Sequence, residues 1–249
     1  MSGKAKLWSW LAYHCYLRHP HFDQVLARRW QWRRYLARNR RVLEVGPGGG
    51  VWTLELLRRG NSVTVVDVSA ASLSALQAKL ARFPLKNRDI RLVRSHAADY
   101  SSRETYDQVV LFEVLEHIAE DGRAVRNLAG HLSPGGEMLI SVPHSGHIPL
   151  EGECISEQED GRHVRKGYSR EGLEELLRRE GLEVVGCETA AGYFTRRLED
   201  LSNRAYRITG SRMVLYLLRI LSRPLLHLDF LRPDYPPYTL FVIAVRRGG

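Results

Sequence analysis

Residues 42–50 read Val-Leu-Glu-Val-Gly-Pro-Gly-Gly-Gly, and residues 62–67 read Ser-Val-Thr-Val-Val-Asp. The apolar residues of both segments predict buried strands, and the spacing within residues 51–59 predicts a helix between them. Because glycine has no side chain, the turn at residues 46–50 can bend sharply and approach a ligand closely. Strand, glycine-rich turn, helix and strand form half of a doubly wound α/β sheet, so this stretch predicts a nucleotide site.

Two acidic residues and the glycine spacing narrow the kind of nucleotide site. Glu44 stands two residues before the first glycine, and Asp67 ends the second strand. A dinucleotide-binding fingerprint requires its third glycine three residues after the second, and Val51 occupies that position. This departure disfavours a nicotinamide-dependent oxidoreductase. With Glu44 in front, the turn resembles motif I of the class I S-adenosylmethionine-dependent methyltransferases.

Further stretches strengthen this resemblance. Residues 132–136, Leu-Ser-Pro-Gly-Gly, are common in the superfamily, and residues 112–117, Phe-Glu-Val-Leu-Glu-His, resemble the subgroup that contains the ubiquinone-biosynthesis O-methyltransferases. Residues 162–168 resemble that subgroup's approach to a late helix. The resemblance spans roughly residues 40–190 and 238–247. It implies a Rossmann-like α/β fold, with a seven-stranded, mostly parallel sheet and helices on both faces.

The rest of the chain is expected to add helices to this core within one domain. A length of 249 residues suits one large α/β domain with additions. We expect the core at residues 41–190 and 238–247, with an N-terminal helical cap at residues 1–40. In the resembled family the last two strands form a close antiparallel pair, but here residues 191–237 separate them. A segment this long is expected to be a helical insertion rather than a loop, and to act as a lid over the methyl acceptor.

The net charge of +9 comes from the two ends of the chain. Residues 1–41 carry ten basic residues and one acidic residue, and residues 195–249 carry ten and four. Residues 42–194 carry seventeen and twenty-three. One interpretation is that these arginines only keep the surfaces of helices hydrated. The other is that both ends of the chain face an anionic partner such as a phosphate-bearing substrate, a lipid surface or RNA.

Cysteine usage and hydropathy bear on the compartment. The three cysteines are scattered without a pair or a metal-ligand spacing, which favours a reducing compartment. The N-terminus lacks a secretory signal, and no segment reaches the roughly 20 apolar residues that span a bilayer. We expect a cytoplasmic protein, with peripheral contact with an anionic membrane as an alternative.

The resemblance implies S-adenosylmethionine as the cofactor and S-adenosylhomocysteine as the product. The carboxylate of Asp67 would accept hydrogen bonds from the ribose hydroxyls, and Asp99 would contact the adenine amino group. The alternatives are a helix N-cap for Asp67 and a turn for Asp99. Val68 and Ala98 would sandwich the ring, and backbone carbonyls would bind the ammonium group. The full set expected at the cofactor is Glu44, Gly46, Gly48, Gly50, Asp67, Val68, Ala98, Asp99 and Phe112.

Histidines are the candidates for chemistry at the acceptor. Methyl transfer is an in-line displacement, so the protein chiefly aligns the two reactants and removes a proton from a hydroxyl acceptor. Imidazole has an ordinary pKa near neutral pH. His117 follows the strand end where the acceptor should bind, and His163 belongs to the following long loop. We expect these two as catalytic residues, with a purely structural role as the alternative.

A divalent metal is a further alternative at the same place. Glu113, Glu116 and His117 stand at i, i+3 and i+4 and could share a helix face, with His163 as a later ligand. The ubiquinone-type enzymes and the bacterial small-RNA 2′-O-methyltransferases use such a grouping. Carboxylates with imidazole suit Mg²⁺, Mn²⁺ or Zn²⁺. Because many relatives with a Leu-Glu-His stretch need no metal, we assign no metal ligand.

These patterns predict a methyltransferase that acts on an oxygen of a hydrophobic or lipid-linked small molecule. The rival interpretations are an RNA methyltransferase, for which no RNA-binding motif is present, and a non-catalytic S-adenosylmethionine-binding partner protein. Within the insertion, residues 213–228 predict an apolar helix that Pro224 kinks or ends, with Arg212, Arg219 and Arg223 on one stripe. This helix is expected to pack as a lid or to lie at a membrane interface.

Overall fold

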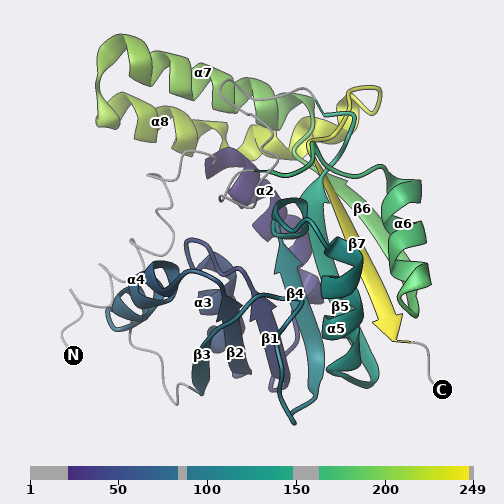
Figure 1. The fold of residues 1–249 in the computed structure, drawn as a ribbon. Coiled ribbons are helices and arrows are strands. Elements are labelled where there is room, and N and C mark those ends of the chain that lie inside the picture. Colours follow the sequence, from purple (N-terminus) through teal and green to yellow (C-terminus); the bar gives the residue numbers. More distant parts are fainter. Residues whose placement is uncertain (1–21, 84–88, 148–162, 247–249) are drawn as a thin grey trace. The chain divides into compact units, whose positions relative to one another are not determined.

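The computed structural model describes residues 22–83, 89–147 and 163–246 (Figure 1). Residues 1–21 of the expected N-terminal cap and residues 148–162 of the long loop lie outside the described residues. The chain divides into two compact units. The larger unit consists of residues 36–188 and 239–249, and the helical unit consists of residues 1–35 and 189–238.

The described residues contain a seven-stranded sheet with the order β3-β2-β1-β4-β5-β7-β6. The pairs β1–β2, β1–β4, β2–β3 and β4–β5 are parallel, whereas β5 and β7 are antiparallel. This confirms the predicted mostly parallel sheet. The strands are β1 (Arg41–Val45), β2 (Ser62–Asp67), β3 (Ile90–Arg94), β4 (Tyr106–Phe112), β5 (Leu132–Pro143), β6 (Leu182–Ala190) and β7 (Thr239–Arg246).

Alternating side chains of the central strands build the core on the two faces of the sheet. Leu43 and Val45 of β1 belong to a buried cluster with Leu128 and Leu177, which come from two helices on one face. Val42 and Glu44 point to the opposite face, and α3 packs against β2. The helices of the larger unit are α3 (Val51–Arg58), α4 (Ala70–Leu80), α5 (Asp121–Gly130) and α6 (Arg170–Arg179), with a short 3-10 turn η3 (Leu115–His117).

Local signals define where these helices begin. Ser69 caps α4 by accepting a hydrogen bond from Ser72 N at 3.1 Å. Ser169 caps α6 in the same way from Gly172 N at 3.0 Å, as its sequence predicts. The N-terminus of α3 instead follows Gly50, whose φ of +71° lies in the left-handed region. A Cβ at Gly50 would lie 2.5 Å from Leu76 Cδ1, so only glycine permits α4 to pack onto this turn.

The insertion is helical, as expected. Its elements are α7 (Tyr193–Thr209), α8 (Arg212–Ser222) and the 3-10 helix η4 (Arg223–Leu231), and the same unit contains α2 (Phe22–Trp32) and η2 (Arg33–Tyr35). Figure 1 shows α7 and α8 side by side, joined by a short turn in which Gly210 has a φ of +63°. The apolar helix α8 ends at Ser222, two residues before Pro224, and the 3-10 helix η4 begins at the next residue.

The start of α7 is tied to η4 by one side chain. Both carboxylate oxygens of Asp229 accept hydrogen bonds there, from Gly192 N at 2.9 Å, Thr195 N at 3.0 Å and Thr195 Oγ1 at 2.6 Å.

None of the described helices is both long enough and apolar enough to cross a membrane.

Candidate active site

A cavity of about 700 Å³ opens at the carboxyl ends of β1 and β2 in the larger unit. β1 lies between β2 and β4 in the sheet, which is the switch point where ligands bind in doubly wound folds. The cavity brings together most of the residues expected at the cofactor and the acceptor. These are Gly46, Gly48, Asp67, Val68, Ala98, Asp99 and His117.

Glycine occupies the first two glycine positions of the turn for different structural reasons. Gly46 has a φ of +64°, and a Cβ there would lie 2.5 Å from Val114 Cγ2. Gly48 has a φ of +47°, and a Cβ there would meet no atom within 4 Å. Because Gly48 lines the cavity, its backbone is open to a ligand, whereas the lack of a side chain at Gly50 is explained by packing on α4.

The carboxylate of Asp67 is oriented by the first turn of α4. Its Oδ1 accepts a hydrogen bond from Ser69 N at 2.7 Å, and its Oδ2 accepts one from Ser72 Oγ at 3.0 Å. Ser69 is the N-cap of α4, so that role is not needed from Asp67. Each carboxylate oxygen can accept more than one hydrogen bond, so Asp67 retains capacity for hydroxyl donors in the cavity.

Asp99 sits in a cluster of charges at the same cavity. Its carboxylate forms an ion pair with Arg123, which also pairs with Glu120 at 2.8 Å. Its backbone N donates to His96 O at 3.1 Å, so the turn considered as an alternative is present too. The sequence analysis missed Arg123 and Glu120. Their i, i+3 spacing at the start of α5 is the signal that could have indicated this pair.

Glu44 and Phe112 do not line the cavity. Glu44 is fully buried, and this burial raises the pKa of its carboxyl to about 7 against an opposing hydrogen bond from Thr53. The ring of Phe112 packs edge-to-face on Trp52 with centroids 4.7 Å apart. A role for the backbone carbonyls of Glu44 or Phe112 at the cofactor stays a prediction.

The two candidate catalytic histidines meet at one edge of the cavity. The rings of His117 and His163 contact edge-to-face, and His163 Nε2 lies 3.9 Å from Oε1 of the fully buried Glu116. One ligand atom from each of the three residues lies within 4.8 Å of the others. Glu113 is not part of this group, because it precedes the 3-10 turn and has a φ of +57° rather than a helical conformation. Its carboxylate accepts a hydrogen bond from Ser141 Oγ at 3.0 Å instead.

An arginine and a tyrosine hold the turn that carries Glu116 and His117. Arg165 Nη1 donates to Leu115 O at 2.9 Å and to Ile118 O at 2.6 Å. Its Nη2 donates to Ala119 O at 3.0 Å. The hydroxyl of Tyr168 donates to Asp121 Oδ2 at 2.7 Å. The sequence analysis placed Arg165 and Tyr168 in a resembling stretch but gave them no role.

The helical unit contains a second cavity, of about 620 Å³. Most of its lining is apolar, from α2, the start of α7, η4 and the segment before β7. It includes Ala27, Ala191, Leu226, Phe230, Tyr235 and Pro237. A mostly apolar cavity of this size is typical of sites for small organic ligands.

A family model described as a methyltransferase domain matches residues 13–186. Among curated proteins, the chain is 31% identical over 154 residues to the ubiquinone biosynthesis O-methyltransferase of Marinobacter nauticus, covering 58% of this chain and 64% of that protein. It is 30% identical over 103 residues to the protein of the same name from Stutzerimonas stutzeri, covering 41% and 44%. The chain thus matches less than two thirds of the length of these relatives.

Solved structures share the fold. An S-adenosylmethionine-dependent methyltransferase from Mesorhizobium loti superposes with a TM-score of 0.60 at 20% identity, covering 88% of this chain and 98% of that chain. The N-methyltransferase NodS from Bradyrhizobium japonicum, in complex with S-adenosylhomocysteine, has a TM-score of 0.54 at 16% identity and covers 93% and 87%. The [4+2]-cyclase SpnF has a TM-score of 0.57 at 18% identity and covers 86% and 77%. Such a fold therefore hosts more than one reaction.

Proposed function

The chain belongs to the methyltransferase domain family as an S-adenosylmethionine-dependent enzyme, and we propose that it methylates an oxygen of a hydrophobic or lipid-linked small molecule. The names of the curated relatives support an oxygen as the acceptor atom. The observation that carries the proposal is the position of His117. This imidazole lines the same cavity as Asp67 and the glycine turn, so a base and the cofactor-binding groups share one space.

The residues at the cavity fit the parts of S-adenosylmethionine, which supplies an activated methyl group on its sulfonium. Asp67, with both oxygens directed by α4, would hold the ribose hydroxyls. The open backbone at Gly48 would lie against the cofactor, and Val68 and Ala98 would cover the adenine. In this proposal Asp99 accepts a hydrogen bond from the adenine amino group while its ion pair with Arg123 orients the carboxylate.

At the acceptor, His117 would remove the proton of a hydroxyl as its oxygen takes up the methyl group. The buried Glu116 would stabilise the positive charge that develops on the imidazole pair, since an opposite charge nearby favours the charged form. His163 would fix the orientation of the His117 ring by its edge-to-face contact. All three residues belong to the larger unit.

The same three side chains also fit a divalent metal ion. One carboxylate and two imidazoles are a donor set that transition-metal ions accept, and the three ligand atoms lie close enough to share an ion. Glu116, His117 and His163 would then hold the metal, and the acceptor hydroxyl would be acidified by it. Chelation tests the metal, because activity that survives chelator dialysis removes it from the mechanism.

The second cavity supports an apolar acceptor. We propose that this cavity of the helical unit binds an apolar group of the acceptor, and the role of the insertion as a lid stays a prediction. Ala27→Phe would fill this space. It should raise the KM for a prenylated substrate about tenfold and leave the KM for the same ring without its chain unchanged.

The direct test is an acceptor screen that measures S-adenosylhomocysteine release. We expect release with prenylated catechols and phenols, and much less with amines or with RNA. Preferred turnover of RNA would replace the small-molecule proposal with the RNA methyltransferase. If calorimetry shows cofactor binding and no acceptor gives release, the protein is instead a non-catalytic S-adenosylmethionine-binding partner.

A further inference from the structure

Helix α8 buries polar residues beside Leu215 and exposes large apolar side chains, unlike an ordinary surface helix. Arg219 is 1% exposed, and Ser222 is also buried. In contrast, Met213 is 71% exposed, Leu217 54% and Leu221 69%. A helix on the surface of a globular protein normally turns its apolar stripe toward the core and its charged residues toward water.

The hairpin with α7 accounts for the buried polar face. Arg219 Nη2 donates to Asn203 Oδ1 of α7 at 3.0 Å, and Ser222 Oγ donates to Arg219 O at 3.1 Å. Polar groups can be buried when their hydrogen bonds are made within the protein. Because the bond from Arg219 to Asn203 holds this face against α7, the opposite, apolar face of α8 is left outward. Exposed apolar side chains continue along η4 at Leu225, Phe230 and Leu231.

The neighbouring helix α7 carries exposed positive charge. Arg197, Leu201, Arg204 and Ile208 recur at i, i+4, i+7 and i+11, so they share one face of α7. All four are exposed, and so is Arg207. Guanidinium groups therefore alternate with apolar side chains on this face. Long apolar side chains next to arginines are the pattern that an interfacial helix presents to anionic lipids.

We propose that the α7–α8–η4 segment docks on an anionic membrane surface. The exposed apolar side chains of α8 and η4 would enter the headgroup region, and Arg197, Arg204 and Arg207 would bind lipid phosphates. This differs from the sequence-based expectation, in which Arg212, Arg219 and Arg223 reach the headgroups. Arg219 cannot do so because it is buried against α7, and the other two side chains lie outside the described residues.

An anionic membrane is favoured over a second copy of this chain by charge. Among the described side chains of α7, α8 and η4, the exposed charges are three arginines (Arg197, Arg204 and Arg207) against Asp200, so two such surfaces would repel each other. An anionic bilayer complements both properties of the surface at once. Binding to it should be strong at low salt and weak at high salt, because the arginine contribution is screened.

The test is co-sedimentation of the full chain with vesicles of phosphatidylcholine alone or with 30% phosphatidylglycerol, on the order of the anionic content at which basic segments bind. We expect binding to the anionic vesicles that falls at least ~10-fold at 0.5 M salt, as Debye screening requires. The triple variant Met213→Ser, Leu217→Ser and Leu221→Ser should lose binding, and so should Arg204→Glu with Arg207→Glu. Matched controls are Val185→Ser and Arg103→Glu, which are exposed positions of the larger unit.

Calorimetry with S-adenosylmethionine checks that the larger unit of each variant is folded, and circular dichroism checks that the helices of the helical unit are retained. The proposal is overturned if the parent protein fails to bind anionic vesicles at low salt, or if it binds both vesicle types equally. It is also overturned if sedimentation shows a dimer that the Met213, Leu217 and Leu221 changes dissociate. That result would assign the surface to a second copy of the chain.

Discussion

The imidazole rings of His117 and His163 lie edge-to-face, with centroids 4.7 Å apart and planes inclined by 78°. They come from opposite ends of a long stretch of chain, and the backbone joins them again where Val164 N donates to Glu116 O at 2.9 Å. The return of the chain after the long loop therefore completes the site at the cavity. Four predictions follow from the contacts around this pair and around the cofactor cavity.

Asp67→Ala should weaken S-adenosylmethionine binding by about 10²–10⁴-fold. Two charge-assisted hydrogen bonds to the ribose hydroxyls would be lost, each worth roughly 1.5–3 kcal/mol. Titration calorimetry measures the change, and thermal unfolding checks that α4 keeps its Ser69 cap. Asp89→Ala removes an exposed acid outside the cavity and is the control. Equal affinity of the Asp67 variant and the parent would refute the assignment.

His117→Ala should lower kcat by about 10²–10⁴-fold and leave cofactor affinity nearly unchanged, because a general base contributes an effect of that size. His163→Ala should have a smaller effect if it only orients His117. Turnover before and after chelator dialysis distinguishes a histidine base from a metal site. Loss on chelation and recovery with a divalent ion would assign Glu116, His117 and His163 as metal ligands and remove the base.

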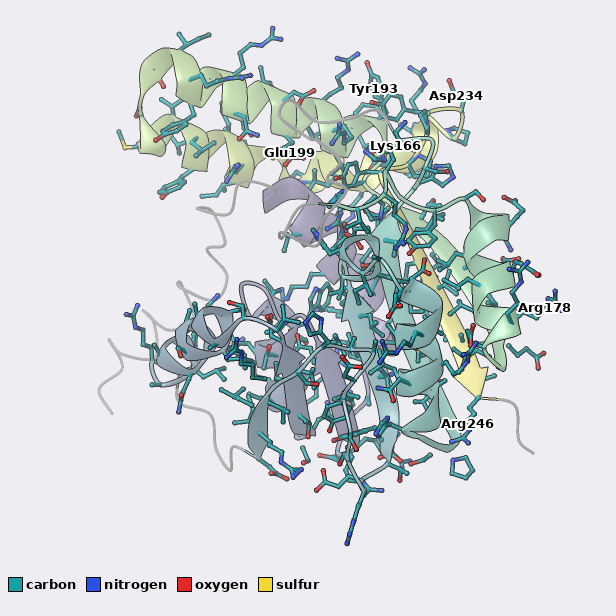
Figure 2. The ribbon with its side chains drawn as sticks, viewed as in Figure 1. Lys166, Arg178, Tyr193, Glu199, Asp234 and Arg246 are labelled. Carbon is teal, nitrogen blue, oxygen red and sulfur yellow. The ribbon has the colours of Figure 1, made fainter. Side chains whose placement is uncertain are left out.

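Arg165→Lys should lower kcat by roughly 10- to 100-fold, since a small displacement of a reacting group is costly. Lysine keeps the charge but lacks the planar fork that reaches Leu115, Ile118 and Ala119 together. Cofactor affinity should stay within a few-fold of the parent. Arg178→Lys is the control, because Figure 2 shows Arg178 projecting from the outer side of α6. An unchanged kcat would show that the turn holds its shape without Arg165.

Stability should fall between about pH 4.5 and pH 7 because of Glu44. Burial raises the pKa of this carboxyl from 4.5 to about 7, so in that window the folded chain binds a proton that the unfolded chain has released. The resulting loss is fully present above pH 7 and amounts to roughly 3–4 kcal/mol at ~1.4 kcal/mol per pH unit. Glu44→Gln should remove it. Urea unfolding of both proteins at pH 4.5 and pH 8 measures the difference, and parallel losses in the two proteins would contradict this prediction.

The local parts of the fold and site follow from the sequence alone. Short-range periodicity and the positions of the glycines predict the strand, glycine turn and helix at residues 42–58. These signals depend on neighbouring residues only. The same holds for the Ser169 cap and for the place of Asp67 at the end of β2. The mostly parallel order of the sheet follows from the resemblance carried by these local motifs.

Packing between distant segments decided the rest. Three features depend on contacts between segments that are distant in the sequence, which no short-range pattern encodes. They are the contact of His163 with His117, the hydrogen bonds of Arg165 to the turn beside them, and the hydrogen bond between Ser141 and Glu113. The direction of Arg219 is the clearest case. Helical spacing places it on a stripe, but only the pairing of α8 with α7 determines that Arg219 is buried and that Leu217 and Leu221 face outward. A sequence period specifies which residues share a face, and tertiary contacts specify where that face points.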